Sequence, residues 1–149
     1  MNNLKYYRGG LELKKKNDIN INTPKVPVSW GELFDKITIL QIKLENLTSK
    51  NALNNVEREF NELQSILIKY FPNSTEAKQL EEELKQTNKQ LWDIEDKIRD
   101  KERNSSFDED FIHLARSVYI VNDKRSLIKR KINNIFGSEF VEEKSYSEY

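Results

Sequence analysis

Hydrophobic side chains recur along the chain at alternating steps of three and four residues, in four separate stretches. The seam positions of the first stretch are Trp30, Leu33, Ile37, Leu40, Leu44 and Leu47. The equivalent positions of the others are Leu53, Val56, Phe60, Leu63, Leu67 and Tyr70, then Leu80, Leu84, Thr87, Leu91, Ile94 and Ile98, and lastly Phe111, Leu114, Val118, Val121, Arg125, Ile128, Ile132 and Ile135. This heptad spacing predicts four amphipathic helices with seams typical of coiled-coil packing.

Helix-starting and helix-breaking residues separate these stretches. The segments Ser29–Glu32 and Ser106–Glu109 fit the S-x-x-E capping box, and Gly137 follows the last stretch where a left-handed cap belongs. Pro72 ends the second stretch, and Ser74 or its neighbour caps the third. Because the turns are short, consecutive helices should lie antiparallel. We predict an all-α antiparallel bundle of four helices made of two hairpins, the second of two long helices.

Charge is distributed unevenly between the two ends of the chain. We expect a basic N-terminal arm over 1–28, a helical bundle domain over 29–137 and an acidic C-terminal tail over 138–149. In the arm, the pair Gly9-Gly10 and the alternating residues 19–22 predict a short hairpin or an extended lead-in. The opposite charges leave two alternatives, in which the ends dock on each other or both are solvated.

Composition narrows the classes of function. The 149 residues include 25 basic and 25 acidic side chains and no cysteine. A chain without net charge has no general attraction for nucleic acid or an anionic membrane, and without cysteine it has no thiol chemistry. No secretion signal and no apolar run near the roughly 20 residues of a membrane span are present. We therefore expect a cytoplasmic protein without nucleic acid or membrane insertion, and its many Asn, Lys and Ile residues indicate a low-GC host.

Two of the predicted helices are apolar on a second face. The additional apolar residues are Phe34, Ile39 and Ile42 in the first helix and Ile112, Tyr119, Ile120 and Leu127 in the last. A helix that is apolar on two faces usually buries both. A chain of this length has few elements left to cover them, so we expect a homo-oligomer. The alternative is that the two terminal arms cover these faces.

One seam position of the last helix carries a charge. Arg125 should be buried there, and a buried guanidinium without a partner is costly, so it needs a carboxylate. The candidates on facing helices are Asp35, Glu32 and Glu95. Such a pair either fixes the register of the bundle or belongs to a ligand site. A guanidinium that reaches the bundle end would need no pair.

A second group of polar residues lies off the seams. Its members are Trp92, Glu95, Asp96 and Arg99 on one face of the third helix, and Arg116, Asp123 and Arg130 at seven-residue intervals in the fourth. If these helices pair, the side chains could converge into a polar cleft for a ligand. The alternative is a half-exposed charged face with ion pairs between neighbouring turns.

Metal chemistry is the weakest alternative. All-α nucleotide pyrophosphohydrolases hold magnesium with closely spaced acidic pairs, and magnesium prefers such converging oxygens. The acidic pairs with this spacing are Glu59 with Glu62, Asp93 with Asp96, and Glu32 with Asp35. Such pairs also arise by chance in an acid-rich chain, and the single histidine, His113, provides no histidine cluster. We expect no metal and no cofactor.

Several blocks of sequence point to a family. They are Val28–Lys43, Leu91–Asp96, Phe111–Tyr119 with Asn122–Arg125 and Lys129–Asn133, then Gly137-Ser138 and Glu143–Tyr146. In this order they resemble a family of small bacterial and phage helical proteins, the domain of unknown function 6165. The resemblance implies an accessory role beside surface-polysaccharide or sugar-transfer proteins, near which the family's members occur, and a protein partner in glycan synthesis.

The family's polar signature falls largely on the residues that helical spacing selects. Its positions here are Asp35, Lys36, Lys43, Glu95, Asp96, Arg116, Asn122, Asp123 and Arg125. Together with Trp92 and Arg99, these are the residues that we predict to bind a ligand. The identity of the ligand stays open.

Three functions remain, in order of preference. The first is a non-enzymatic helical interaction or scaffold module that self-associates. The second is a small-molecule enzyme or binder with an Arg/Glu cleft for an anionic ligand, by analogy with helical mutases such as chorismate mutase. The third is a magnesium-dependent all-α nucleotide pyrophosphohydrolase.

Overall fold

The predicted all-α fold is confirmed. A computed structural model describes residues 24–143 and 145, which form four α-helices and no strand. The helices are α1 (Trp30–Asn46), α2 (Lys50–Tyr70), α3 (Thr75–Arg103) and α4 (Glu109–Ile135). None of the four combines the length and the apolar character of a membrane-spanning segment. The expectations for Gly9-Gly10 and for residues 19–22 lie outside the described residues.

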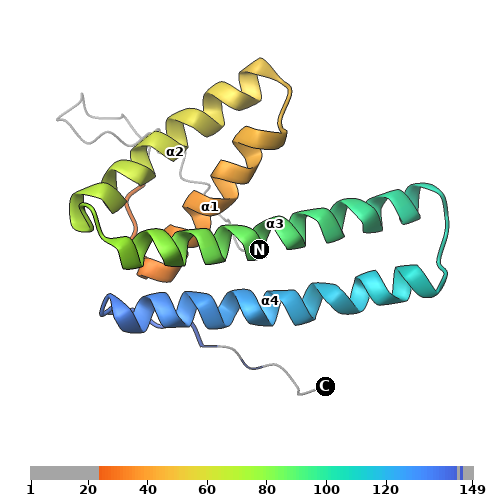
Figure 1. The fold of residues 1–149 in the computed structure, drawn as a ribbon. Helices are drawn as coiled ribbons and strands as arrows, with labels where there is room; N and C mark the ends of the chain where they lie inside the picture. Colours follow the sequence, from red (N-terminus) through yellow and green to blue (C-terminus); the bar gives the residue numbers. More distant parts are fainter. Residues whose placement is uncertain (1–23, 144, 146–149) are drawn as a thin grey trace, which may run out of the picture.

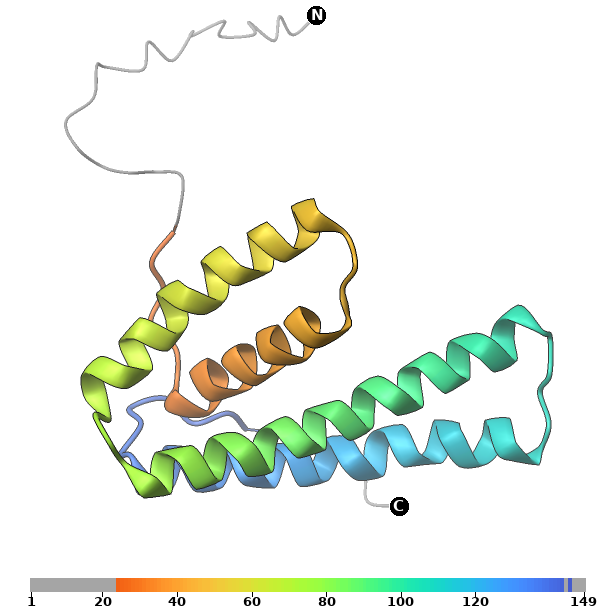
Figure 2. The same ribbon diagram turned by 45° about the horizontal axis from the view of Figure 1, so that its top comes forward.

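The two hairpins differ in size and do not form a symmetric bundle. α3 and α4 make a long antiparallel hairpin, and the shorter hairpin of α1 and α2 lies against one end of it (Figures 1 and 2). Among these four helices, α1 packs along each of the other three, whereas α2 packs only along α1. The other end of the α3–α4 hairpin therefore projects beyond the rest of the molecule (Figure 1).

The central place of α1 accounts for its second apolar face. Phe34 is 0% exposed and Ile42 is 1% exposed, while Ile39 is half-buried. Because α2, α3 and α4 lie on different sides of α1, the chain covers this face by itself. On α1, a second copy of the protein is therefore not needed to explain the two apolar faces.

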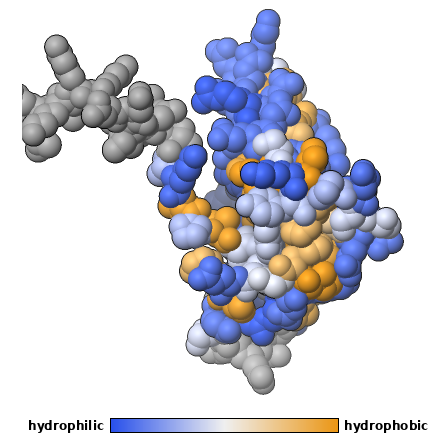
Figure 3. Space-filling model, turned by 90° about the vertical axis from the view of Figure 1, so that its left-hand side faces the viewer, coloured by the Kyte–Doolittle hydropathy of each residue, from blue (hydrophilic) through white to orange (hydrophobic). Residues whose placement is uncertain are grey.

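Aromatic side chains fill the core where α2 passes into α3 and α4 ends. The Trp30 ring lies 4.8 Å from the Phe71 ring and 5.2 Å from the Tyr70 ring, edge to face in both cases. Phe136 lies 4.3 Å from Phe71 and stacks 5.7 Å from Phe34. Figure 3 looks onto this end, where patches of hydrophobic side chains lie among hydrophilic ones. These contacts join the beginning of α1 to the end of α4.

Four of the predicted helix ends are found and one is corrected. α2 ends at Tyr70, shortly before Pro72. The Ser29 and Ser74 hydroxyls accept backbone amides at the starts of α1 and α3. Gly137 has a φ of 63°, and the Ser138 amide after it donates to the Asn133 carbonyl at 2.8 Å, as in a Schellman cap. At the start of α4 the predicted Ser106–Glu109 box was wrong.

Asp108 caps α4 because its carboxylate is held at the helix end by other contacts. It accepts the Phe111 amide at 3.0 Å, the Ser106 hydroxyl at 3.0 Å and the Lys101 ammonium group at 2.8 Å. The bonds from Lys101, Phe111 and Ser106, in that order, lower the pKa of Asp108 from 3.8 to about 2. The carboxylate two residues after Ser106 thus takes the place that the hydroxyl would have filled.

Acid should loosen this helix start. A carboxylate whose pKa is lowered by folding stabilises the fold above its ordinary pKa, and this contribution is lost as the pH falls from about 4 toward about 2. We expect the amides of Phe111 and Ile112 to lose protection over that range in hydrogen exchange followed by NMR. Asp108→Asn, which keeps a cap but cannot titrate, should show no such transition. The Asp110 side chain is 79% exposed, so Asp110→Asn should leave the transition unchanged. If Asp108→Asn still shows the transition, a group other than Asp108 causes it.

Candidate functional site

The first turn of α1 is bonded to the end of α4. The Trp30 amide donates to Ser138 Oγ at 2.8 Å, and the Gly31 amide donates to Asn133 Oδ1 at 2.7 Å. The Ser138 hydroxyl donates to the same Asn133 oxygen at 2.9 Å. The first amides of a helix have no partner within it, and here side chains 108 and 102 residues away supply one. Gly31 permits this approach, because a Cβ there would lie 2.7 Å from the Lys129 carbonyl oxygen.

One turn further along α1, Asp35 lies in a buried polar network that joins three helices. Arg125 of α4 donates to both carboxylate oxygens, with 2.8 Å between Nε and Oδ1. Asn88 of α3 donates to Asp35 Oδ1 and to Thr38 Oγ1, each at 2.9 Å. Arg125 also donates through Nη1 to Asn122 Oδ1 at 3.2 Å. We call these five residues the Asp35 network; it holds α1, α3 and α4 in one register.

The ion pair at the centre of the network resolves the choice of partner for Arg125. Of the three candidate carboxylates, Asp35 is the one bound, with a side chain that is 5% exposed against 26% for Arg125. The bond to Asp35 raises the pKa of Arg125, although burial lowers it. Both charges are therefore compensated by groups of the same chain. Of the predicted alternatives, this geometry favours a pair that fixes the register of the helices.

A second buried cation on α4 is Lys129. Its ammonium group pairs with Glu32 of α1 and, at 2.8 Å, with Glu142 of the C-terminal tail. Burial lowers the pKa of Lys129, but the bonds to Glu142 and Glu32 outweigh it and raise the pKa. Next to it, Arg130 pairs with Glu143 at 3.2 Å. The acidic tail thus contacts α4, whereas the predicted contact between the tail and the basic arm involves residues outside those described.

Three of the eleven predicted ligand-binding residues meet in the Asp35 network, namely Asp35, Asn122 and Arg125. Four more, Lys36, Glu95, Arg99 and Arg116, make bonds on the surface: Lys36 to Glu59 at 3.1 Å, Glu95 to Arg99 at 3.3 Å, and Arg116 to Tyr119 at 3.4 Å. Of the others, Lys43, Trp92 and Asp123 are half-buried and Asp96 is exposed. Glu95, Arg116 and Arg125 therefore bond to different partners. Binding of an anionic ligand by this set stays a prediction.

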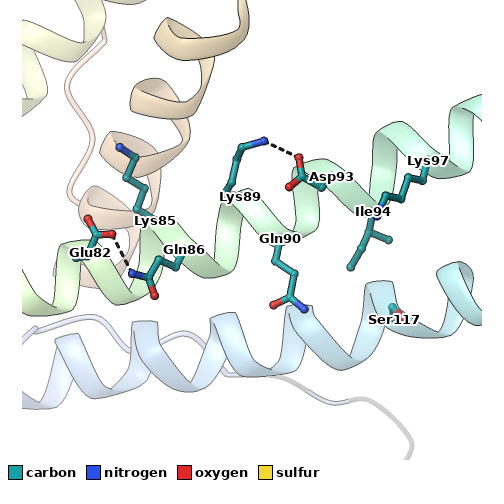
Figure 4. Close-up of a pocket in the computed structure, with 9 residues that line it drawn as sticks. All are labelled: Glu82, Lys85, Gln86, Lys89, Gln90, Asp93, Ile94, Lys97 and Ser117. Carbon is teal, nitrogen blue, oxygen red and sulfur yellow. Dashed lines mark hydrogen bonds and ion pairs between the residues drawn. The ribbon is translucent and has the colours of Figure 1, made fainter.

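One depression in the described surface runs along α3 and faces α4 (Figure 4). The Gln90 and Ile94 side chains point toward α4 in it, and it is open to solvent. Four of its polar groups bond in pairs, Lys89 to Asp93 at 2.5 Å and Gln86 to Glu82 at 3.0 Å, and Lys85 bonds to Glu45 of α1 at 2.6 Å. It contains none of the predicted site residues. The depression has the character of a solvated face with ion pairs.

The three acidic pairs that could have held magnesium do not come together at one point of the described structure. Among residues 24–143 and 145, no three carboxylate or histidine side chains are placed to share a metal ion. Three of the acidic residues pair with lysines instead: Glu59 with Lys36, Asp93 with Lys89, and Glu32 with Lys129. The described residues do not form the site that the third hypothesis requires.

Several residues that make these contacts were not selected from the sequence, among them Gly31, Asn88, Asn133 and Ser138. A signal existed for Gly31, because glycine lowers helix stability and its presence in a first turn indicates close backbone approach. Asn88 lies next to the seam residue Thr87, where a polar side chain beside a core position could have indicated a buried bond. Asn133 and Ser138 carried no signal beyond their place in the family-like blocks.

A family model matches residues 24–149, and its description is a family of unknown function (DUF6165). The match includes all four helices and every residue of the Asp35 network. It confirms the resemblance seen in the sequence blocks. No curated protein and no solved structure matches the chain.

Proposed function

This chain belongs to the DUF6165 family of unknown function, and from that premise we propose that it is a helical interaction module that self-associates. One observation carries the proposal. On the side of α4 turned away from the core, Ile112 is 47% exposed, Tyr119 38%, Ile120 47% and Leu127 68%. We call these four residues the α4 outer row.

The rest of the molecule supports an interaction role. The Asp35 network and Lys129 satisfy their charges within the chain, which suits a rigid scaffold more than a site that exchanges a charged ligand. Large apolar side chains that recur about every seven residues on the outside of one helix, with Arg116 and Asp123 between them, form a surface that a partner helix can cover. Since α1 covers its second apolar face by itself, the α4 outer row is the one of the two predicted second faces that stays exposed. The link to surface-polysaccharide synthesis rests on the family resemblance alone and stays a prediction.

Size-exclusion chromatography with light scattering tests the proposal. The chain has a mass of 17.7 kDa, and we expect the full-length protein to show a multiple of it at micromolar concentration. Ile120→Glu with Leu127→Glu should give the single-chain mass. Ile68→Glu, at a 60% exposed position of α2, is the matched control and should not. A single-chain mass for the unaltered protein would refute self-association, and an assembly that persists without residues 1–23 would exclude the arm as its cause.

A further inference from the structure

The exposed side of α4 has a symmetry in its sequence. Ile112 and Leu127 lie at equal distances from a point between residues 119 and 120, and so do Tyr119 and Ile120. The charged residues between them, Arg116 and Asp123, share the same midpoint. Each apolar residue therefore has an apolar counterpart about this point, and the cation has an anion.

Two antiparallel helices related by a twofold axis bring such counterparts to the same height. With the axis at this midpoint, Ile112 of one copy lies level with Leu127 of the other, and Tyr119 lies level with Ile120. Arg116 then lies level with Asp123, and the contact occurs twice. A parallel arrangement would instead place Arg116 beside Arg116 and Asp123 beside Asp123, which is repulsive.

We propose that two copies of this chain dock α4 against α4, antiparallel, with the twofold axis passing between Tyr119 and Ile120. This inference rests on the proposed self-association and specifies its register. At 1.5 Å per residue, the interface from Ile112 to Leu127 is about 22 Å long. It occupies the side of α4 opposite Val121 and Ile128, which are buried against the rest of the chain.

The elements that pack on α4 leave the α4 outer row exposed. α1 and α3 pack on α4, which buries Val121 and Ile128 on the side away from the row. The tail contacts at Lys129 and Arg130 follow Leu127 within one turn and lie level with the start of α4 in the second copy. Leu127 is 68% exposed with those contacts in place. Tyr119 and Asp123 already have a contact within the chain, so the second copy adds to it.

Disulfide cross-linking of engineered cysteines can test this register, because the chain has no cysteine of its own. Under mild oxidation Ile120→Cys should form a covalent dimer, since residue 120 lies beside the axis. Ile112→Cys and Leu127→Cys should each fail to cross-link alone, because identical positions lie about 22 Å apart, far beyond the roughly 7 Å that a disulfide spans. A mixture of these two variants should cross-link. Ile68→Cys on α2 measures cross-linking by random collision.

The outcomes separate this inference from the proposed function. Cross-linking of Ile120→Cys and of the mixed pair, several-fold above the Ile68→Cys background, supports the antiparallel register. Self-cross-linking of all three α4 variants would mean a parallel pair and overturn it. If none cross-links while light scattering still shows an assembly, the interface lies elsewhere and only the inference fails. If every variant and the unaltered protein has the single-chain mass, the inference and the proposed function both fail.

Discussion

Replacing Asp35 by alanine is expected to lower the free energy of unfolding by about 3–5 kcal/mol, the range for removing one partner of a buried ion pair. Asp35 is bonded to Arg125 through both oxygens and also to Asn88. Its loss leaves the guanidinium, which is mostly enclosed, without its counter-charge and the Asn88 amide without an acceptor. Three helices meet at this carboxylate, so its removal affects the whole of the α1 packing.

The neighbouring residue provides a matched control. Lys36 pairs with Glu59 on the surface, where both side chains are about half exposed, and an exposed pair contributes only about 0–1 kcal/mol. Lys36→Ala should therefore shift the urea midpoint little. Arg125→Met combined with Asp35→Ala should recover part of the loss, because no unpaired charge remains. The comparison needs one protein concentration, since self-association adds to apparent stability. Equal losses in Asp35→Ala and Lys36→Ala would show that water replaces the buried pair.

Gly31→Ala is expected to lower the free energy of unfolding by about 2–3 kcal/mol, the upper part of the range for overpacking. In an ordinary helix the same change stabilises by nearly 1 kcal/mol. Here the added Cβ would lie 2.7 Å from the Lys129 carbonyl oxygen and 3.0 Å from Asn133 Oδ1. A backbone oxygen held in a helix cannot turn aside, so α1 must move away from α4 and lose the Gly31–Asn133 bond.

Gly137→Ala separates crowding from backbone strain. Nothing lies within 4 Å of a Cβ at Gly137, but its φ of +63° is unfavourable for alanine. We expect a loss of about 1 kcal/mol there, from conformation alone. Thermal unfolding followed by circular dichroism measures both variants. A stabilised Gly31→Ala would mean that α1 and α4 do not approach as closely in solution.

Hydrophobic spacing was sufficient to predict the helices but not their packing partners. The heptad seams depend only on local periodicity, and α1 to α4 follow them closely. Which helix becomes central depends on contacts between distant segments, and the second apolar face of α1 was a signal that could be read in two ways. We read it as an oligomer contact. The structure covers it with α3 and α4, because α1 is placed between them and α2.

The candidate site shows the same division between local and distant information. The seam position of Arg125 indicated a buried cation and limited its partners to three carboxylates. Selecting Asp35 required the register between α1 and α4, which no pattern within one helix contains. Glu95 and Arg99 have the spacing of an ion pair between turns, and this is the contact that they make. The predicted cap of α4 was wrong for a related reason. Lys101, near the end of α3, bonds to Asp108 across the turn, and Asp108 rather than Ser106 accepts the Phe111 amide in the first turn of α4.

The bonds from Asn133 and Ser138 to the first amides of α1 have a consequence for the order in which the chain is completed. α1 is translated before α2, α3 and α4, yet the groups that satisfy its first turn follow only at the end of α4. Contacts at such sequence separation form slowly. The α3–α4 hairpin can form from residues close together in the sequence. The first amides of α1 have no such partner until the end of α4 has been made. α1 is thus made before the groups that complete its first turn, and removal of Asn133 and Ser138 would affect the start of α1, more than 100 residues away.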